Sequence, residues 1–452
     1  MRFPVISLSF YQNRRVGVLG LGKTGTSVVE AMIASGAEVE VHDDCDSTIE
    51  TCRQLRKMTV DSIKRLDIMI VSPGISLLWP VAHPMVIAAK KHAIPILSDV
   101  DLFQQHIQNG KGIYITGTNG KSTTTALIHY LLAAAGKKVT AGGNFKQTIL
   151  SLDPLADFFV IEISSYQLES SGILGFDTAI LLNVTPDHLT RHGGIEGYLT
   201  NKQKIFANFT NRSIAIVGVD DENCASIARF LQKIKHPCLV QISGRNVPAF
   251  GVGWNNNLLV DNRRGESEVV CNGSMLQLDG DHNRQNIAAA YAACADILEK
   301  ETFCQGLSSF TGLNHRQEVI TCIDGIIYVN DSKATNSDSA EQALKRFDNI
   351  VWILGGRPKE KGLEDLVKYF GKVKFAFLIG EGAEDFAQTL GKYGVRHEIT
   401  GTLDVAVRRS KEIARVYDAK VVLLSPVCAS FDQFKDFEDR GDQFRALVRD
   451  LK

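Results

Sequence analysis

Short apolar segments recur along the chain, and a polar or glycine-containing turn follows almost every one of them. Between these segments apolar residues return every three or four positions, which is the spacing of a helix that buries one face. The alternation predicts parallel sheets covered by helices, with the turns at the carboxyl edge of each sheet, where such folds bind ligands. The main strands expected from the apolar runs are 15–19, 39–41, 67–71, 112–116, 157–163, 178–182, 213–217, 326–330, 350–354, 375–379 and 421–424.

Two polar stretches interrupt this pattern and divide the chain. Residues 104–111 contain an Asn-Gly pair, and residues 311–314 connect two series of strands and helices. At about 100–200 residues per domain, the 452-residue chain predicts three α/β domains, at 1–107, 108–311 and 312–452. We expect a Rossmann-like N-terminal domain, a central P-loop ATPase-like domain and a Rossmann-like C-terminal domain. Alternation and Asn-rich turns within 248–273 predict small antiparallel hairpins in the central domain.

Composition excludes several classes of protein. The formal net charge is −1, so no overall field attracts nucleic acid or an anionic membrane. The nine cysteines are scattered and never spaced as C-x-x-C, which indicates reduced thiols, not a disulfide framework or a zinc site. Residues 1–10 lack the pattern of a signal peptide, and no run approaches the roughly 18 apolar residues of a membrane span. We therefore expect a cytoplasmic protein that binds no nucleic acid and is not embedded in a membrane.

The segment 112–125, GIYITGTNGKSTTT, carries the strongest chemical signal. A strand leads into a loop with two glycines, and a lysine and hydroxyls open the next helix; these residues are Gly117, Thr118, Asn119, Gly120, Lys121, Ser122 and Thr123. Backbone N–H groups and the helix N-terminus would cradle a polyphosphate, and the Ser122 hydroxyl would hold Mg²⁺. The sequence therefore predicts an ATP site. The strict phosphate-loop pattern needs glycine where Ile115 stands, so this loop is a variant whose first glycine is Gly117. The alternative interpretation is a glycine-rich turn that binds nothing.

Polar side chains that follow the neighbouring strands extend this prediction. Glu162 interrupts a buried strand, where a carboxylate is costly unless it is paired or bound to metal. It is therefore either a Mg²⁺ ligand or part of a structural salt bridge. His188 follows the next strand and could hold a second cation or be structural. Lys202 and Lys204 have the composition of solvated surface charges, and Asn283 is either a helix cap or a nucleotide contact.

The N-terminal domain has its own nucleotide motif. Residues 20–25, GLGKTG, match G-x-G-x-x-G between a strand and a helix, and Asp43 follows the next strand. This spacing alone favours NAD, although the same turn suits any nucleotide diphosphate. The turn 72–75 would present backbone amides at the same sheet edge, or it is a plain packing turn.

Taken together, these segments resemble the Mur ligase family of peptidoglycan synthesis over essentially the whole chain. The motifs are TGTNGKS at 116–122, EISS at 162–165, NVTPDH at 183–188, HNRQN at 282–286, GLNHR at 312–316 and NDSKATN at 330–336. The closing run 425–441, SPVCASFDQFKDFEDRG, resembles the branch that adds D-glutamate. The resemblance implies ATP-dependent ligation of D-glutamate to UDP-N-acetylmuramoyl-L-alanine through an acyl phosphate, with release of ADP and phosphate. It implies ATP and two Mg²⁺ ions, a uridine diphosphate in place of NAD at 20–25, and a monomer.

The resemblance also implies roles for individual residues. The catalytic residues would be Lys121, Glu162, His188 and Lys202, the last as a carbamate that ligates metal. The metal ligands would be Ser122, Glu162, His188 and carbamylated Lys202. ATP contacts would add Asn283, Asn286, Arg316, Asp331 and Lys333 to the phosphate loop. The UDP-substrate would meet Lys23, Thr24, Asp43, Ser72, Pro73, Gly74, Asn144 and His188. D-Glutamate would meet Thr335, Lys359, Ser430 and Phe437.

Three departures from the family pattern and three rival functions accompany this interpretation. Gly218 stands where the family usually has asparagine, Tyr166 replaces phenylalanine, and Arg357-Pro358 precedes Lys359. The rivals are a sibling ligase that adds another amino acid to the same precursor or glutamate to folate, a nucleotide-binding dehydrogenase and a non-catalytic ATP switch. The G-x-G-x-x-G motif and the closing run argue against both sibling ligases, and the phosphate loop would be unexplained in a dehydrogenase. The presence of Lys121, Glu162 and His188 argues against the switch.

Overall fold

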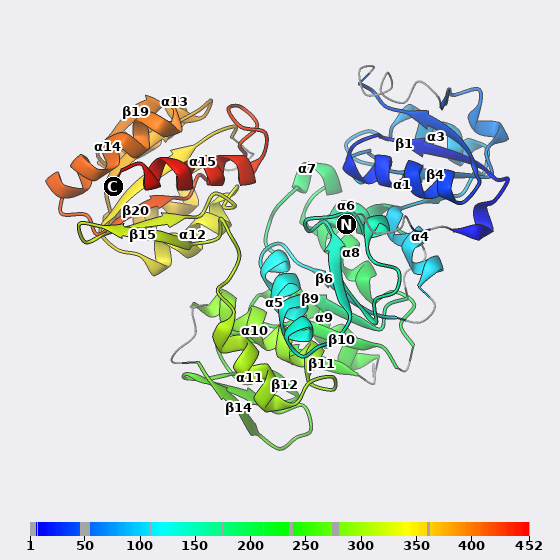
Figure 1. Cartoon of the computed structure of the whole chain (residues 1–452), viewed down its shortest axis with the longest axis horizontal. Helices are drawn as coiled ribbons and strands as arrows, with labels where there is room; N and C mark the ends of the chain where they lie inside the picture. The colour runs from blue at the N-terminus through cyan, green and yellow to red at the C-terminus, as the bar shows by residue number, and fades with distance from the viewer. Residues whose placement is uncertain are drawn as a thin grey trace. The chain divides into compact units, whose positions relative to one another are not determined.

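The computed structural model describes residues 6, 8–45, 55–107, 110–172, 175–210, 212–234, 238–273, 280–358 and 362–451. The chain forms two compact units, Met1–Phe310 and Thr311–Lys452, and each is described by itself below (Figure 1). The first unit contains two sheets and the second contains one.

The N-terminal sheet is five-stranded and entirely parallel, in the order β3-β2-β1-β4-β5. Its strands are β1 (Arg15–Leu19), β2 (Glu38–His42), β3 (Arg56–Lys57), β4 (Ile68–Val71) and β5 (Ile96–Leu97). The helices are α1 (Lys23–Ala34), α3 (Pro84–Lys91) and α4 (Asp99–His106), with short 3₁₀ turns at Ser9–Tyr11 and Ile63–Arg65. The strand order changes direction between β1 and β4, and a doubly wound sheet binds ligands at such a point.

The central sheet has nine strands, in the order β14-β13-β12-β11-β10-β9-β6-β8-β7. Its strands are β6 (Lys111–Thr116), β7 (Val139–Gly143), β8 (Phe158–Glu162), β9 (Thr178–Leu181), β10 (Ile214–Gly218), β11 (Leu239–Ile242), β12 (Gly251–Asn255), β13 (Leu258–Asp261) and β14 (Glu268–Asn272). Pairing is parallel from β7 to β12 and antiparallel across β12, β13 and β14. The predicted hairpins within 248–273 are therefore confirmed. Because β6 lies between β9 and β8, the turns after these strands meet at one edge.

Helices and 3₁₀ turns connect the central strands. They are α5 (Lys121–Ala134), η3 (Ile149–Ser151), α6 (Ser165–Ser170), α7 (Leu189–His192), α8 (Ile195–Gln203), η4 (Lys204–Phe206), α9 (Glu222–Lys233), α10 (Asp281–Cys294) and α11 (Lys300–Ser309). Helix α5 begins at Lys121, directly after the loop, where Gly120 adopts a left-handed conformation (φ 86°).

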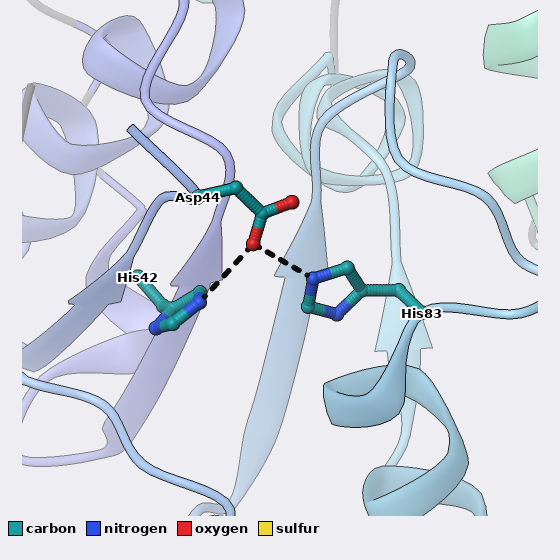
Figure 2. Close-up of side chains that lie close together, drawn as sticks. All are labelled: His42, Asp44 and His83. Atoms are coloured by element: carbon teal, nitrogen blue, oxygen red, sulfur yellow. Dashed lines mark hydrogen bonds and ion pairs between the residues drawn. The ribbon is translucent and has the colours of Figure 1, made fainter. Parts of the chain in front are cut away.

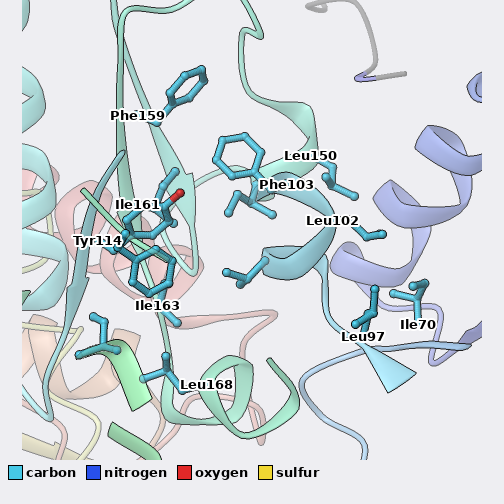
Figure 3. Packing of buried hydrophobic residues seen from close by; sticks show 14 of the residues in the cluster. Ile70, Leu97, Leu102, Phe103, Tyr114, Leu150, Phe159, Ile161, Ile163 and Leu168 are labelled. Carbon is cyan, nitrogen blue, oxygen red and sulfur yellow. The ribbon is translucent and has the colours of Figure 1, made fainter. Parts of the chain in front are cut away.

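One hydrophobic core joins the first two sheets within the first unit (Figure 3). The rings of Phe103 in α4 and Phe159 in β8 meet edge to face, with their centroids 5.3 Å apart. Hydrogen bonds flank this contact: Ser98 Oγ lies 2.9 Å from Ser171 Oγ, and Gly172 N donates to Asp101 Oδ1 at 3.0 Å. Helix α4 is thereby fixed to the segment that follows Glu162.

The second unit has a six-stranded sheet in the order β15-β16-β20-β17-β18-β19. Its strands are β15 (Glu318–Ile323), β16 (Ile326–Asn330), β17 (Ile350–Gly355), β18 (Val373–Ile379), β19 (His397–Gly401) and β20 (Val421–Leu424). Only the pairing of β15 with β16 is antiparallel among the strands of this sheet that the structure describes. The connecting elements are α12 (Ser337–Arg346), η5 (Glu364–Lys372), α13 (Ala383–Lys392), α14 (Leu403–Val416) and α15 (Phe437–Arg449).

Each face of this last sheet has its own hydrophobic cluster. Trp352 and Leu354 of β17 contribute to one cluster, and Val351 and Ile353 contribute to the other. Helices therefore cover both faces, as expected of a doubly wound fold. The three-domain α/β prediction is confirmed at the level of fold, and the residue boundaries 107/108 and 311/312 stay predictions. In the described part of the chain, no helix is both long enough and apolar enough to cross a bilayer.

Candidate active site

The predicted phosphate loop connects β6 to α5 and is clamped by the turn after β9. Gly117 (φ 155°) and Gly120 (φ 86°) adopt backbone conformations that other residues rarely reach. Asn183 holds the loop twice: its backbone O accepts from Thr118 N at 2.9 Å, and its Oδ1 accepts from Asn119 N at 2.8 Å. The loop is thus preorganised by its neighbour in the sheet.

Two lysines converge on one carbonyl of this loop. Lys121 Nζ donates to Gly117 O at 2.9 Å and to Thr118 O at 2.8 Å. Lys202 Nζ donates to the same Gly117 O at 2.8 Å, and it lies 3.4 Å from Thr116 Oγ1. Two ammonium groups on one oxygen repel each other, so the arrangement favours an added anion or the loss of one proton.

Lys202 is buried, whereas Lys204 is not. Only 1% of the Lys202 surface is exposed, and its Nζ lies 4.7 Å from the centroid of the Tyr198 ring. Burial, and secondarily the Lys121 charge, hold the pKa of Lys202 well below its usual value. Lys204 is half-buried and donates to Glu169 O at 3.1 Å. The expectation from composition, that both lysines are solvated, is therefore wrong for Lys202.

Glu162 ends β8 beside this loop and is 2% exposed. Its Oε1 accepts from Asn144 Nδ2 at 2.9 Å. Its Oε2 is buried and has no hydrogen-bond partner among the described residues. A buried carboxylate oxygen with no donor is costly, and it is a ligand type that Mg²⁺ prefers. Asn144, predicted to contact the UDP-substrate, is placed by this hydrogen bond at Glu162.

His188 lies between a carboxylate and a phenol. It precedes α7 with a left-handed backbone (φ 55°). Its Nδ1 lies 3.0 Å from the hydroxyl of Tyr166, and its Nε2 lies 3.5 Å from Asp187 Oδ2. The tyrosine that departs from the family pattern therefore contacts the predicted catalytic histidine directly.

Helix α10 brings the predicted nucleotide asparagines to the loop. Asn286 Oδ1 accepts from Thr124 Oγ1 at 3.2 Å and would lie 2.3 Å from a Cβ placed on Gly120. Asn286 Nδ2 reaches Asn283 Oδ1 at 3.4 Å. A Cβ at Gly218 would lie 1.9 Å from the carbonyl oxygen of Leu182, so a side chain at this position would require the backbone of this structure to shift.

Hydrogen bonds to the residues that follow β2 and β4 fix the conformation of the N-terminal glycine motif. Asp43 Oδ2 accepts from Leu21 N at 2.6 Å, and Ser72 Oγ donates to Gly20 O at 2.7 Å. A Cβ at Gly25 would lie 1.8 Å from the Gly20 carbonyl oxygen, which accounts for the third glycine of the motif. A groove of about 500 Å³ opens beside Lys23; it is lined by Leu21, Gly22, Lys23, Thr26, Ser27, Glu30, Lys146, Gln147, Thr148 and Ser151. Thr24 lies in the first turn of α1, and Pro73 and Gly74 lie in the turn after β4.

A cluster of His42, Asp44 and His83 lies next to Asp43 (Figure 2). Asp44 Oδ1 lies 3.4 Å from His42 Nε2 and 3.1 Å from His83 Nε2. His83 Nδ1 accepts from Met85 N at 3.2 Å, so Nε2 carries the proton of the neutral ring and donates to Asp44. A histidine that binds metal through one ring nitrogen usually donates a hydrogen bond from the other. Here the other nitrogen of His83 accepts a hydrogen bond, and that of His42 is buried without a partner among the described residues. We interpret the cluster as a structural connection between β2 and α3.

Five of the predicted residues of the C-terminal unit, Asp331, Lys333, Thr335, Ser430 and Phe437, lie after β16 or β20, which are neighbours in the sheet. Asp331 Oδ2 accepts from Ser425 Oγ at 2.8 Å, and burial raises the pKa of Asp331 to about 7. Lys333 Nζ lies 3.7 Å from the centroid of the Phe437 ring. Thr335 N donates to Lys333 O at 2.8 Å. Arg316 and the buried Ser430 belong to the same unit, and Lys359 lies outside the described residues.

Arg440 was given no role by the sequence, although it is fully buried. Its guanidinium donates to the oxygens of Ser332 at 3.0 and 2.9 Å and to Cys428 O at 3.2 Å. Its Nη1 has no partner among the described residues. Arg440 therefore joins the segment after β16 to the segment after β20. A single arginine in a helix with many charges gives no sequence signal of burial.

Comparison with known proteins agrees with this architecture. Residues 14–98 match the family model described as Mur ligase MurD-like, N-terminal domain. Residues 115–294 match Mur ligase middle domain, and residues 315–428 match Mur ligase, glutamate ligase domain. The three matches follow the order of the three sheets.

Relatives and solved structures extend over the whole chain. The UDP-N-acetylmuramoylalanine--D-glutamate ligase of Paramagnetospirillum magneticum is 43% identical over 98% of both chains. That of Rhodospirillum rubrum is 41% identical over 99% of this chain and 97% of its own. The fold is similar to UDP-N-acetylmuramate-alanine ligase MurC from Thermotoga maritima (TM-score 0.59, 15% identity, 97% and 100% of the two chains). It is also similar to MurF from Acinetobacter baumannii (TM-score 0.58, 17% identity, 99% and 92%). The chain belongs to the Mur ligase family, and its full-length relatives place it among the UDP-N-acetylmuramoylalanine--D-glutamate ligases of that family.

Proposed function

We propose that the protein is an ATP-dependent amide ligase that adds D-glutamate to UDP-N-acetylmuramoyl-L-alanine. The full-length relatives bear the name of this reaction, and the phosphate loop supports it. The observation that carries the proposal is the convergence of Lys121 and Lys202 on Gly117 O, beside the unpartnered Oε2 of Glu162. This is a site with cations and a metal-type ligand already in place around a polyphosphate cradle.

The first step joins two anions, so positive charge must be placed between them. The L-alanine carboxylate attacks the γ-phosphorus of ATP, and the bond between this phosphorus and the β-phosphate oxygen breaks. The products of this step are an acyl phosphate and ADP. The loop amides and Asn283, Asn286, Arg316, Asp331 and Lys333 would bind the nucleotide. Lys121 would then exchange its bonds to Gly117 O and Thr118 O for the β- and γ-phosphate oxygens.

We propose that the site takes two Mg²⁺ ions. Ser122 and Glu162 would hold one, and His188 with carbamylated Lys202 would hold the other. Mg²⁺ supplies charge neutralisation of the phosphate oxygens when it is bound. The chain contributes ligands that are already oriented: Asn144 holds one oxygen of Glu162 and leaves Oε2 for the ion.

Lys202 suits carbamylation because of its burial. A carbamate forms when a neutral amine attacks CO₂ and releases one proton, and the depressed pKa of Lys202 favours that neutral amine. The product replaces a cation next to Lys121 with an anion. The repulsion between the two lysines would thereby become an attraction.

The second step forms the amide bond. The amine of D-glutamate attacks the carbonyl carbon of the acyl phosphate, loses a proton, and phosphate departs. We propose that Thr335, Lys359, Ser430 and Phe437 receive D-glutamate. Arg440 ties the segment of Ser332, which leads to Thr335, to the segment of Cys428, which leads to Ser430. The UDP group would lie against Lys23, Thr24, Asp43, Ser72, Pro73, Gly74, Asn144 and His188.

Phosphate release in the presence of ATP, Mg²⁺ and UDP-N-acetylmuramoyl-L-alanine tests the reaction, with only the amino acid varied. We expect release with D-glutamate and none with L-glutamate, L-alanine, L-lysine or diaminopimelate. A Lys121→Ala variant should abolish the signal. Release with another amino acid would keep the family and reject this substrate. No release with any amino acid, from a folded protein, would reject the ligase function.

We further propose that the enzyme acts as a cytoplasmic monomer. Its expected substrates, ATP and a nucleotide sugar, are cytoplasmic, and the cysteines of the described residues are free thiols. Light scattering coupled to gel filtration should give a mass near the 49.6 kDa of one chain. A mass of twice that value at assay concentration would reject the monomer.

A further inference from the structure

Arg191 contacts both the turn after β4 and the surroundings of His188. It lies in α7, three residues after His188, and its side chain is 13% exposed. Its Nη2 donates to Ile75 O at 2.5 Å and lies 3.5 Å from Pro73 O, and its Nη1 lies 3.3 Å from Gly74 O. One guanidinium thus holds three successive carbonyls of the turn after β4. That turn includes Pro73 and Gly74, which we propose contact the UDP-substrate.

The same guanidinium lies against the neighbour of His188. The Arg191 Cζ atom is 5.1 Å from the centroid of the Tyr166 ring, and the Tyr166 hydroxyl is 3.0 Å from His188 Nδ1. A backbone hydrogen bond also links the two residues directly, since Arg191 N donates to His188 O at 3.1 Å. The position of the turn is therefore connected to the imidazole by two routes, the Tyr166 ring and the α7 backbone.

Charge around Arg191 is balanced within the central domain. Its Nε donates to Glu169 Oε2 at 2.8 Å, and the Glu169 side chain is 10% exposed. The Glu169 carboxylate binds only Nε and so orients the guanidinium, while both terminal nitrogens, Nη1 and Nη2, contact the turn. A lysine could keep the charge and one of these contacts. It could not reproduce the planar fork or the stacking on Tyr166.

We propose that Arg191 is a positioning residue that couples occupation of the 73–75 turn by the UDP-substrate to the orientation of His188, with Tyr166 as the intermediate contact. The inference rests on the proposed function, because it assigns this turn to the UDP-substrate and His188 to the metal and phosphate side. It gives a reason for tyrosine at position 166: the ring receives Arg191 and the hydroxyl orients the imidazole. A phenylalanine could do only the first.

Two conservative variants separate the two halves of this connection. Arg191→Lys keeps the charge and loses the fork, so it should raise the KM for UDP-N-acetylmuramoyl-L-alanine about tenfold and also raise the Mg²⁺ concentration at half-maximal rate. Tyr166→Phe keeps the ring under Arg191 and loses the hydroxyl. It should leave the KM for the UDP-substrate within about twofold while it lowers kcat and raises the Mg²⁺ requirement about three- to tenfold.

A matched control is Arg229→Lys, because Arg229 pairs with Glu222 on the exposed surface of α9. It should change none of these constants. Calorimetric titration with the UDP-substrate, without ATP or metal, gives a readout independent of turnover. Arg191→Lys should bind about tenfold more weakly in it, and Tyr166→Phe should bind as the unaltered protein does.

The double variant provides the decisive comparison. If Arg191 acts through Tyr166, the effects on the Mg²⁺ requirement should not add: the double variant should resemble the worse single variant. Additive effects, or an Arg191→Lys protein that differs from the unaltered enzyme only in melting temperature, would overturn the coupling. If the unaltered enzyme shows no D-glutamate-dependent phosphate release, the proposed function fails instead. The calorimetric arm still tests the contact of Arg191 with the nucleotide turn.

Discussion

At the scale of single residues, the central site contains two ionisable groups whose burial costs free energy that the described contacts do not fully offset. The Lys202 ammonium is removed from water and contacts two oxygens and the face of the Tyr198 ring, close to the Lys121 ammonium. The Glu162 carboxylate keeps one oxygen that has no donor among the described residues. Such strained polar groups are typical of sites completed by a ligand. Removing either charge should therefore separate stability from activity.

Lys202 supplies the first test. Lys202→Ala and Lys202→Arg should both be nearly inactive, because neither side chain can form a carbamate, and short carboxylates added to Lys202→Ala should restore part of the rate. Protein incubated with ¹³C-labelled CO₂ should show a carbamate resonance that Lys202→Ala lacks. Lys204→Ala is the matched control, since its ammonium donates to a backbone carbonyl of α6 away from the loop. Full turnover of Lys202→Ala would contradict the assignment.

Glu162→Gln tests the carboxylate without changing its shape. The amide oxygen can still accept from Asn144, so the metal-free protein should melt at the same temperature or higher. The rate should fall about 100-fold or more, because a charged ligand of the cation is lost. Glu196→Gln on the exposed surface of α8 is the control and should change neither quantity. Equal losses of stability and activity in Glu162→Gln would indicate a structural salt bridge instead.

At the scale of elements, the start of α5 is shaped by a helix far away in sequence. Gly120 ends the loop in a left-handed conformation, and Asn286 of α10 occupies the space where its side chain would be. The same asparagine accepts from Thr124 in the first turn of α5. The packing of α10 on α5 thus fixes the helix start that we propose binds phosphate.

Two glycines at opposite ends of α5 allow the cost of a left-handed backbone to be distinguished from the cost of a steric clash with Asn286. Gly120→Ala adds a left-handed alanine and a Cβ 2.3 Å from Asn286 Oδ1, whereas Gly136→Ala (φ 73°) adds the same strain with no atom within 4 Å. Gly136→Ala should lose about 1–2 kcal/mol of stability and keep its KM for ATP. Gly120→Ala should lose more stability and raise the KM for ATP. Thermal melts and ATP titrations measure both, and identical behaviour of the two variants would contradict the role of Asn286.

The sequence predicted elements better than contacts, for a physical reason. Apolar runs and glycine turns are local signals, so the strands, their parallel pairing around β6 and the loop before α5 could be anticipated, whereas the order of the strands could not. Burial of Lys202 depends on how α8 docks beside β6, so composition could not separate it from Lys204. Arg191 was given no role from the sequence, because the carbonyls that it holds in the turn after β4 lie more than a hundred positions away.

At the scale of the whole molecule, a mixed apolar and polar interface joins α4 to β8 and α6 within the first unit. Phe103 packs on Phe159, and the hydrogen bonds of Ser98 and Asp101 to residues 171–172 flank that contact. Asp99 lies in the same interface at 2% exposure; its Oδ2 accepts from Gln167 Nε2 at 3.3 Å, and its Oδ1 has no partner among the described residues. The interface between α4 and the central sheet therefore contains an acid in an unfavourable environment.

Asp99 makes the stability of this unit depend on pH. Burial raises its pKa from 3.8 to about 6, so the folded state holds the proton more tightly than the unfolded state. Stability should therefore fall as pH rises from about 4 to 6, by about 3 kcal/mol in total. Asp99→Asn keeps an acceptor for Gln167 and carries no charge. Its melting temperature should exceed that of the unaltered protein at pH 8, and the difference should vanish toward pH 4. Asp61→Asn, at an exposed position, should show no such trend. A gain for Asp99→Asn that is the same at both pH values would show that the effect is not ionisation, and the carboxylate would then be paired better than its contacts indicate.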